Sequence, residues 1–187
     1  MATRFELVLW GDHPVRLRAL GEEALDEIDR IENLLSLYRP HTDIARINAA
    51  APGTPVRVAP ETLRLLERAR NLSRLTQGTF DPTAGALIRA WGFHQGSGQL
   101  PDPESLRTAL HQIGWERIEL DDDAGQVTRR CEGLLLDLGA IGKGYALDRA
   151  TERLREGGIT CGLLQGGTSS VVALGHPPDA EGWKIAL

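Results

Sequence analysis

The stretch LDLGAIGKGYALDRA, residues 136–150, decides how this chain is organised. It places three glycines, one lysine and two aspartates directly after an apolar run. The run Leu134–Leu138 predicts a buried strand, and the residues after it predict a helix that continues over 148–155 and stops at Gly157–Gly158. Glycine at the turn lets the main chain bend sharply and lets a ligand approach backbone atoms.

Two interpretations of this stretch remain open from its own residues. A carboxylate such as Asp137 is costly at the end of a buried strand unless it is paired or functional. Lys143 and the unpaired N–H groups of a helix start suit a phosphate. The alternative is a glycine-rich turn in which Asp137 caps the helix and Lys143 is solvated. The spacing matches neither the GxxxxGK[ST] phosphate loop nor the GxGxxG dinucleotide motif.

Working outward, the remaining elements alternate between strands and amphipathic helices. Phe5–Trp10 predicts a strand, and the apolar spacing over Leu20–Leu35 predicts a helix docked on a sheet. Residues 36–48 predict a loop with one helical turn. The other predictions are an extended piece at 56–58, helices over 60–76 and 102–113, a hairpin of 118–120 with 126–130, and strands at 160–164, 170–174 and 181–187. This order predicts an α+β fold with a largely antiparallel sheet and packed helices.

Composition narrows the class of protein. The chain has 187 residues, of which 41% are hydrophobic, which is typical of a soluble globular protein. Its net charge of −5 argues against a nucleic-acid partner. Cys131 and Cys161 fit no metal spacing, and we interpret both as reduced thiols. No apolar stretch approaches about 20 residues, and Met1–Arg4 begins no signal peptide, so we expect a cytoplasmic protein.

Three further segments raise the same choice between packing and ligand binding. In TFDPTAGALIRAWGF (79–93), Asp81 is suited to an N-cap before a helix start at Thr83. In LLSLYRPHTDIARIN (34–48), Tyr38 lies in an exposed loop, where its ring can pack or stack on a planar ligand. GLLQGGTSSVV (162–172) joins a strand to a Gly-Gly turn, which is a weak signal by itself.

Together, the four segments resemble the ApbE family of flavin transferases, which move FMN from FAD onto proteins. The family pattern runs S-x-Y-x-P-x-S-x-[IL]-x-x-[IL]-N, then [AG]-F-D-x-T-x-G-x-L-x-x-x-W-G-F, then D-[LF]-[GS]-G-I-[AG]-K-G-[YW]-A-x-D-x-[AL], then G-G-D. These motifs correspond, in this order, to residues 36–48, 79–93, 137–150 and 163–168. The resemblance implies an ApbE-like, T-fold-like architecture with residues 1–187 as a single flavin transferase domain.

The resemblance also implies a bound FAD, a magnesium ion and roles for particular residues. The cofactor-binding residues that it implies are Met1, Tyr38, Thr79, Phe80, Asp81, Asp137 and Lys143. Asp137 and Lys143 are further implied as catalytic residues, and the main-chain carbonyl of Ala140 as a ligand of Mg²⁺. In such a reaction a cation and Lys143 stabilise negative charge that develops on the phosphoryl oxygens. The implied acceptor is a threonine of a target protein, and AMP is the leaving group.

Two departures of the chain from the family pattern matter for its function. Thr168 stands where the pattern has the aspartate of G-G-D. The family's C-terminal third, which carries an Asp and a Thr that complete the magnesium site, has no counterpart here, so the domain is C-terminally incomplete relative to the family. Three explanations follow: a fragment of a longer protein, a shortened member that binds FAD without transferring FMN, or a partner chain that completes the sheet. A bare edge strand at Ile185 favours a homodimer. Hydrolysis of FAD to FMN and AMP is a further alternative, because it differs only in the nucleophile.

Overall fold

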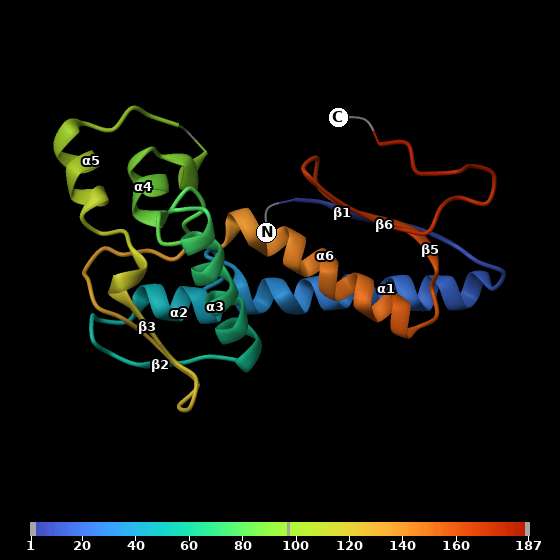
Figure 1. The fold of residues 1–187 in the computed structure, drawn as a ribbon, viewed down its shortest axis with the longest axis horizontal. Coiled ribbons are helices and arrows are strands. Elements are labelled where there is room, and N and C mark those ends of the chain that lie inside the picture. Colours follow the sequence, from blue (N-terminus) through green and yellow to red (C-terminus); the bar gives the residue numbers. More distant parts are fainter. Residues whose placement is uncertain (1–2, 97, 186–187) are drawn as a thin grey trace. The chain divides into compact units, whose positions relative to one another are not determined.

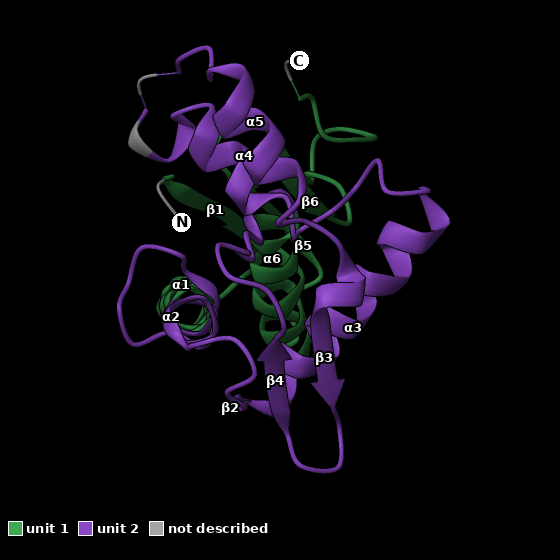
Figure 2. Ribbon diagram, turned by 90° about the vertical axis from the view of Figure 1, so that its left-hand side faces the viewer, with its two compact units in different colours: residues 1–32, 141–187 green, residues 33–140 purple. Residues whose placement is uncertain are grey.

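The structure is a computed structural model that describes residues 3–96 and 98–185. It divides into two compact units, one of residues 1–32 and 141–187 and the other of residues 33–140 (Figure 2). The boundaries fall inside two long helices, α1 (Pro14–Leu35) and α6 (Gly139–Glu156). We describe each unit by itself. That residues 1–187 form one domain stays a prediction.

The first unit contains a three-stranded antiparallel sheet in the order β1-β5-β6 (Figure 1). Its strands are β1 (Phe5–Trp10), β5 (Cys161–Gly166) and β6 (Ser170–Leu174). β1 pairs with β5 in the register Phe5↔Gly166, and β5 forms a hairpin with β6. Alternate residues of β5 are buried, as expected for a strand with one covered face. The predicted strands at 5–10, 160–164 and 170–174 are therefore confirmed within a residue or two.

Helices α1 and α6 complete the first unit and run antiparallel to each other. Arg16 near the start of α1 donates to the Gly157 carbonyl just after α6, while Glu27, three turns further along α1, lies 3.7 Å from the guanidinium of Arg149. α1 begins at Pro14, earlier than the predicted Leu20, because proline has the helical φ already fixed at a first-turn position. The fully or nearly fully buried residues of the two helices are Ala24, Ile28, Ile31, Ala146, Leu147, Ala150 and Leu154.

The second unit contains another three-stranded antiparallel sheet, in the order β2-β4-β3. Its strands are β2 (Val56–Arg57), β3 (Ile118–Asp121) and β4 (Gln126–Arg129), and Gly125 in the β3–β4 turn has a φ of 65°. The hairpin prediction is confirmed. The α+β class is also confirmed, but the antiparallel strands are divided between two sheets.

Four short helices and two 3-10 turns surround this second sheet. They are α2 (Asp43–Ala49), α3 (Pro60–Leu75), α4 (Gly85–Ala90), α5 (Pro103–Leu110), η1 (Phe93–Gln95) and η2 (Trp115–Arg117). The prediction of a loop with one helical turn over 36–48 is confirmed, but the helical part is longer than predicted, because Thr42 caps a two-turn helix by accepting from the Ala45 amide. α5 stops at Leu110 rather than Ile113, since the His111 amide is shared between the carbonyls of Arg107 and Thr108 and the Gln112 amide bonds three residues back to Ala109.

Two predicted strands are absent from the described residues. Leu134–Leu138 forms only one bridge, between Leu135 and Ala84, because the Asn48 side chain and the backbone of a turn at Pro82 and Gly85, rather than a neighbouring strand, satisfy its backbone. Residues 183–185 form no strand either. There, the Trp183 indole instead donates to the Gly175 carbonyl and packs edge-on against Trp10, 5.0 Å between ring centroids.

In the described part of the chain, no helix combines the length and the apolar character needed to cross a membrane.

Candidate functional site

The loop that carries Tyr38 is closed by the polar residues of its own motif. Ser36 Oγ accepts from the Tyr38 amide at 3.1 Å, and Thr42 Oγ1 donates to the Ser36 carbonyl at 2.6 Å. Thr42 also caps α2, so the loop is fixed at both of its ends. Tyr38 itself is 64% exposed, which agrees with the exposed loop tyrosine that the sequence predicts. The loop therefore presents a free aromatic face on a fixed backbone.

The turn at 79–85 positions a second group of motif residues. Asp81 Oδ1 accepts from both the amide and the hydroxyl of Thr83, at 2.9 and 2.8 Å. Thr83 Oγ1 in turn accepts from the Gly114 amide. Thr79 and Phe80 are tied to Thr76 at the end of α3, through its carbonyl and its hydroxyl respectively. The α4 helix starts at Gly85 rather than Thr83, and Asp81 stabilises the turn before it.

Asn48 and Gly85 hold the extended segment that leads to Asp137. The Asn48 amide group donates to the Leu136 carbonyl and accepts from the Leu136 amide, at 2.9 and 2.8 Å. The Gly85 amide donates to the Leu135 carbonyl, and the Asp137 amide donates to the Pro82 carbonyl. A Cβ on Gly85 would lie 2.5 Å from the Leu135 oxygen, so the approach requires glycine. Three of the four motifs thus meet at this segment.

Asp137 and His94 form a largely enclosed polar pair next to these motif residues. One carboxylate oxygen of Asp137, Oδ1, accepts from the Gly139 amide at 2.8 Å, and the other, Oδ2, lies 2.9 Å from His94 Nε2. The two side chains are 15% and 14% exposed. The Tyr38 ring meets the His94 ring edge-on, with 6.3 Å between centroids. Asp137 therefore does cap α6, as one of the two interpretations expects, and it also faces a histidine.

Lys143 belongs to the first unit, where it faces the β5–β6 turn. Its Nζ donates to Ser169 Oγ at 2.7 Å. That turn contains the Gly-Gly pair of the fourth motif: Gly167 has a φ of 65°, and a Cβ on Gly166 would meet the Phe5 ring at 2.9 Å. The backbone conformation at Gly167 and the close packing at Gly166 thus explain why glycine occupies both positions. Thr168, at the position of the family's aspartate, is exposed.

Sequence reasoning missed His94 and Ser169. His94 directly follows the W-G-F motif, and the two glycines on either side of its 3-10 turn, Gly92 and Gly96, both have φ above 70°. Glycines spaced in this way could have indicated a residue presented on a tight turn. Ser169 follows the Gly-Gly turn as one of three hydroxyl residues, and no sequence signal links it to Lys143. Met1, implied as a cofactor contact, lies outside the described residues.

The metal site implied by the resemblance is not completed by the described residues. Among residues 3–96 and 98–185, no group of three or more His, Cys, Asp or Glu side chains could hold a metal ion. Both oxygens of Asp137 already have protein partners. Ala140 is exposed in the first turn of α6 and contributes at most its main-chain oxygen. Mg²⁺ prefers six oxygen ligands, so these residues alone do not fit the ion.

The fold and these two polar groups define an α+β protein in which a loop presents Tyr38, the end of an extended segment presents Asp137, and helix α6 presents Lys143. The ApbE family model matches residues 1–187. The chain therefore belongs to the ApbE family, as the motifs indicate.

Known proteins of this family are similar along most of the chain. A protein of Klebsiella pneumoniae (strain 342) named FAD:protein FMN transferase is 32% identical over 171 residues, which cover 90% of this chain and 51% of that protein. The apo form of the flavinyl transferase ApbE of Pseudomonas stutzeri is 27% identical with a TM-score of 0.83, over 99% of this chain and 62% of that one. The H257G mutant of the Vibrio cholerae flavin transferase ApbE has a TM-score of 0.89 at 24% identity, which shows the fold alone. This chain spans about half the length of the Klebsiella relative.

Proposed function

We propose that this protein takes part in flavin transfer: it moves FMN from FAD to a threonine of an acceptor protein, depends on Mg²⁺ and releases AMP. The observation that carries the proposal is the family match over residues 1–187, in which the motif residues Asp137 and Lys143 each have a defined polar environment. FAD and a protein acceptor are the partners named by the relatives' function.

The two polar groups suit different parts of FAD. An ionised carboxylate accepts hydrogen bonds only and repels phosphate, so Asp137 suits a hydroxyl or a ring N–H. The Lys143 ammonium donates three hydrogen bonds and carries a positive charge, so it suits the pyrophosphate. In the reaction, the threonine hydroxyl oxygen forms a bond to the FMN phosphorus and releases its proton to solvent. The bond from that phosphorus to the bridging oxygen breaks, and AMP leaves with that oxygen and the electron pair. Lys143 stabilises the negative charge that gathers on the phosphoryl oxygens.

Magnesium is the metal that we propose, because phosphate and carbonyl oxygens suit a hard cation. When bound, such an ion would neutralise charge on the phosphates. The described residues would supply only the Ala140 carbonyl to this ion. Location in the cytoplasm, assembly as a homodimer and the roles of Met1, Thr79, Phe80 and Asp81 also stay predictions.

A single incubation tests the proposal against its alternatives. The protein is mixed with FAD, Mg²⁺ and a threonine-containing acceptor peptide, and mass spectrometry and nucleotide chromatography follow the products. We expect FMN-modified peptide and AMP in equal amounts, both reduced when Lys143→Met replaces the wild-type protein. AMP without modified peptide would assign hydrolysis instead. FAD binding without AMP would assign a flavin-binding protein, which Thr168 at the position of the pattern's aspartate favours as the second candidate.

A further inference from the structure

His94 is held in place by the glycine-flanked turn that carries it. It lies at the centre of the 3-10 turn η1, between the left-handed glycines Gly92 and Gly96. Glycine adopts a left-handed backbone conformation at little energetic cost, so these two residues let the chain enter and leave the turn sharply. The side chain is 14% exposed, and its Nε2 lies 2.9 Å from Asp137 Oδ2. The turn therefore directs the imidazole at one carboxylate oxygen.

This contact removes the remaining freedom of the Asp137 side chain. The Gly139 amide holds Oδ1. With that bond alone, the carboxylate could still rotate and offer Oδ2 in several directions. Because an ionised carboxylate is an acceptor, His94 Nε2 is the donor in the second bond. With one donor on each oxygen, the remaining lone pairs have a fixed direction.

We propose that His94 is a positioning residue, which fixes Asp137 as a hydrogen-bond acceptor for a hydroxyl or ring N–H group of FAD. The inference rests on the proposed function, since it assigns Asp137 to the nucleotide. It adds a residue outside the four motif patterns. His94 acts through Asp137 rather than on the reacting atoms.

The test compares three substitutions of His94 by titrating the protein with FAD and following flavin fluorescence. His94→Phe keeps a ring beside Tyr38 but has no donor, and losing a hydrogen bond to a charged group lowers affinity about tenfold or more. His94→Gln places an amide N–H near the position of Nε2, and we expect affinity within about threefold of wild type. His111→Phe, at the exposed end of α5, is the matched control and should not change affinity.

A double-mutant cycle with Asp137→Asn shows whether the effect passes through Asp137. We expect His94→Phe to weaken binding little further in the Asp137→Asn background, because coupled residues are not additive. If His94→Phe gives no cooperative melting transition, His94→Asn replaces it, since its shorter amide does not reach Oδ2. Wild-type affinity in His94→Phe, no rescue by glutamine, or fully additive losses would each overturn the inference while FAD binding stands. Absence of FAD binding in the wild-type protein would overturn the proposed function, and this inference with it.

Discussion

At the scale of single residues, Asp137 shows how a charge is kept in a mostly enclosed place. Its side chain is 15% exposed, and each oxygen has one N–H partner. These hydrogen bonds replace those that water would make to an exposed carboxyl group. The remaining lone pairs are what a ligand can use. Asp148, in the same motif, is exposed on α6 and has no such enclosure.

We expect Asp137→Ala to lower FAD affinity about tenfold or more, because a hydrogen bond to a charged acceptor contributes roughly 1.5–3 kcal/mol. Asp148→Ala, the matched control eleven positions along the sequence, should change affinity less than about twofold. Fluorescence titration of both variants measures the difference. Equal affinities would show that the nucleotide contact has been assigned to the wrong carboxylate.

Residue identities alone could not decide between capping and ligand binding at Asp137. The motif pattern identifies Asp137 as a notable position. In the structure, its carboxylate accepts from the Gly139 amide, which is the capping contact that the sequence allows. Its second partner, His94, is 43 positions away in the sequence and depends on the folding of η1. The same holds for Lys143 and Ser169, which are 26 positions apart. Pairs of this kind are set by tertiary structure, which periodicity and spacing do not describe.

At the scale of elements, the segment 134–138 replaces a strand with a set of individual contacts. Its apolar run predicts a strand, and three of its residues are indeed fully or almost fully buried. A strand also needs a neighbour with a ladder of backbone partners. Here Asn48, Pro82 and Gly85 provide those partners from a helix and a turn. Several motif residues therefore hydrogen-bond the backbone of the segment before Asp137. The family resemblance alone could not distinguish this structural role from a role in ligand binding or catalysis.

We predict that Gly85→Ala destabilises the protein by about 2–4 kcal/mol. The new Cβ would lie 2.5 Å from the Leu135 carbonyl oxygen, so the backbone at residue 85 and the backbone at Leu135 would have to move apart. Urea denaturation measures the change in the free energy of unfolding. Gly144→Ala is the control: it lies within α6 with nothing within 4 Å of the added Cβ. Alanine there should stabilise by up to about 1 kcal/mol. If both variants lose the same stability, close packing at Gly85 is not the cause.

At the scale of the whole molecule, the α+β class of the fold could be predicted from the sequence. The division of the chain into two units, each with its own sheet, could not. The apolar strands β1 and β6 and the amphipathic helix α1 agree with their sequence patterns. The boundary between the two units falls inside α1 and α6, where no linker composition marks it. Antiparallel pairing was expected because the helices do not alternate regularly with strands. Which strands share a sheet depends on contacts over more than 150 positions, as between β1 and β5.

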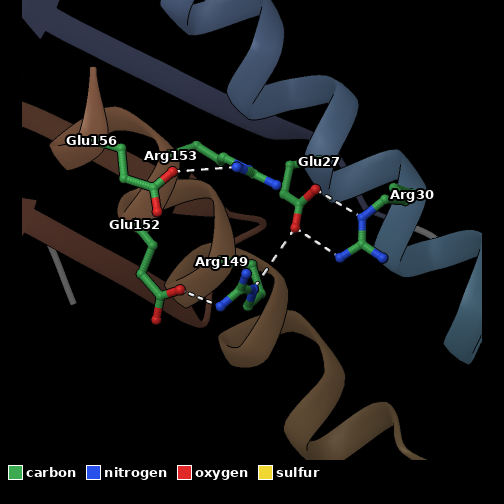
Figure 3. Close-up of polar contacts among 6 residues, drawn as sticks. All are labelled: Glu27, Arg30, Arg149, Glu152, Arg153 and Glu156. Carbon is green, nitrogen blue, oxygen red and sulfur yellow. Dashed lines mark hydrogen bonds and ion pairs between the residues drawn. The ribbon is translucent and has the colours of Figure 1, made fainter. Parts of the chain in front are cut away.

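An ion-pair cluster in the first unit links stability to pH. Glu27, 5% exposed on α1, makes two hydrogen bonds of 2.8 Å to Arg30, and Arg149 of α6 lies 3.7 Å away (Figure 3). The hydrogen bonds from Arg30, together with the positive charges of Arg30, Arg153 and Arg149, lower the pKa of Glu27 below its ordinary 4.5, although burial acts in the opposite direction. Because this pKa is lower in the folded protein, the contribution to stability is present above pH 4.5.

We therefore expect the free energy of unfolding to fall as pH drops below 4.5 and Glu27 becomes protonated through its folded-state pKa. Glu27→Gln removes this charge, so it should cost about 1.5–3 kcal/mol at pH 7 and flatten the acid dependence. Glu22→Gln on the same helix is the control, since Glu22 and Arg18 form an exposed pair that contributes at most about 1 kcal/mol. Urea unfolding of the three proteins at a series of pH values from neutral into the acid range measures both effects. An acid slope in Glu27→Gln as steep as that of the wild type would assign the pH dependence to other carboxylates.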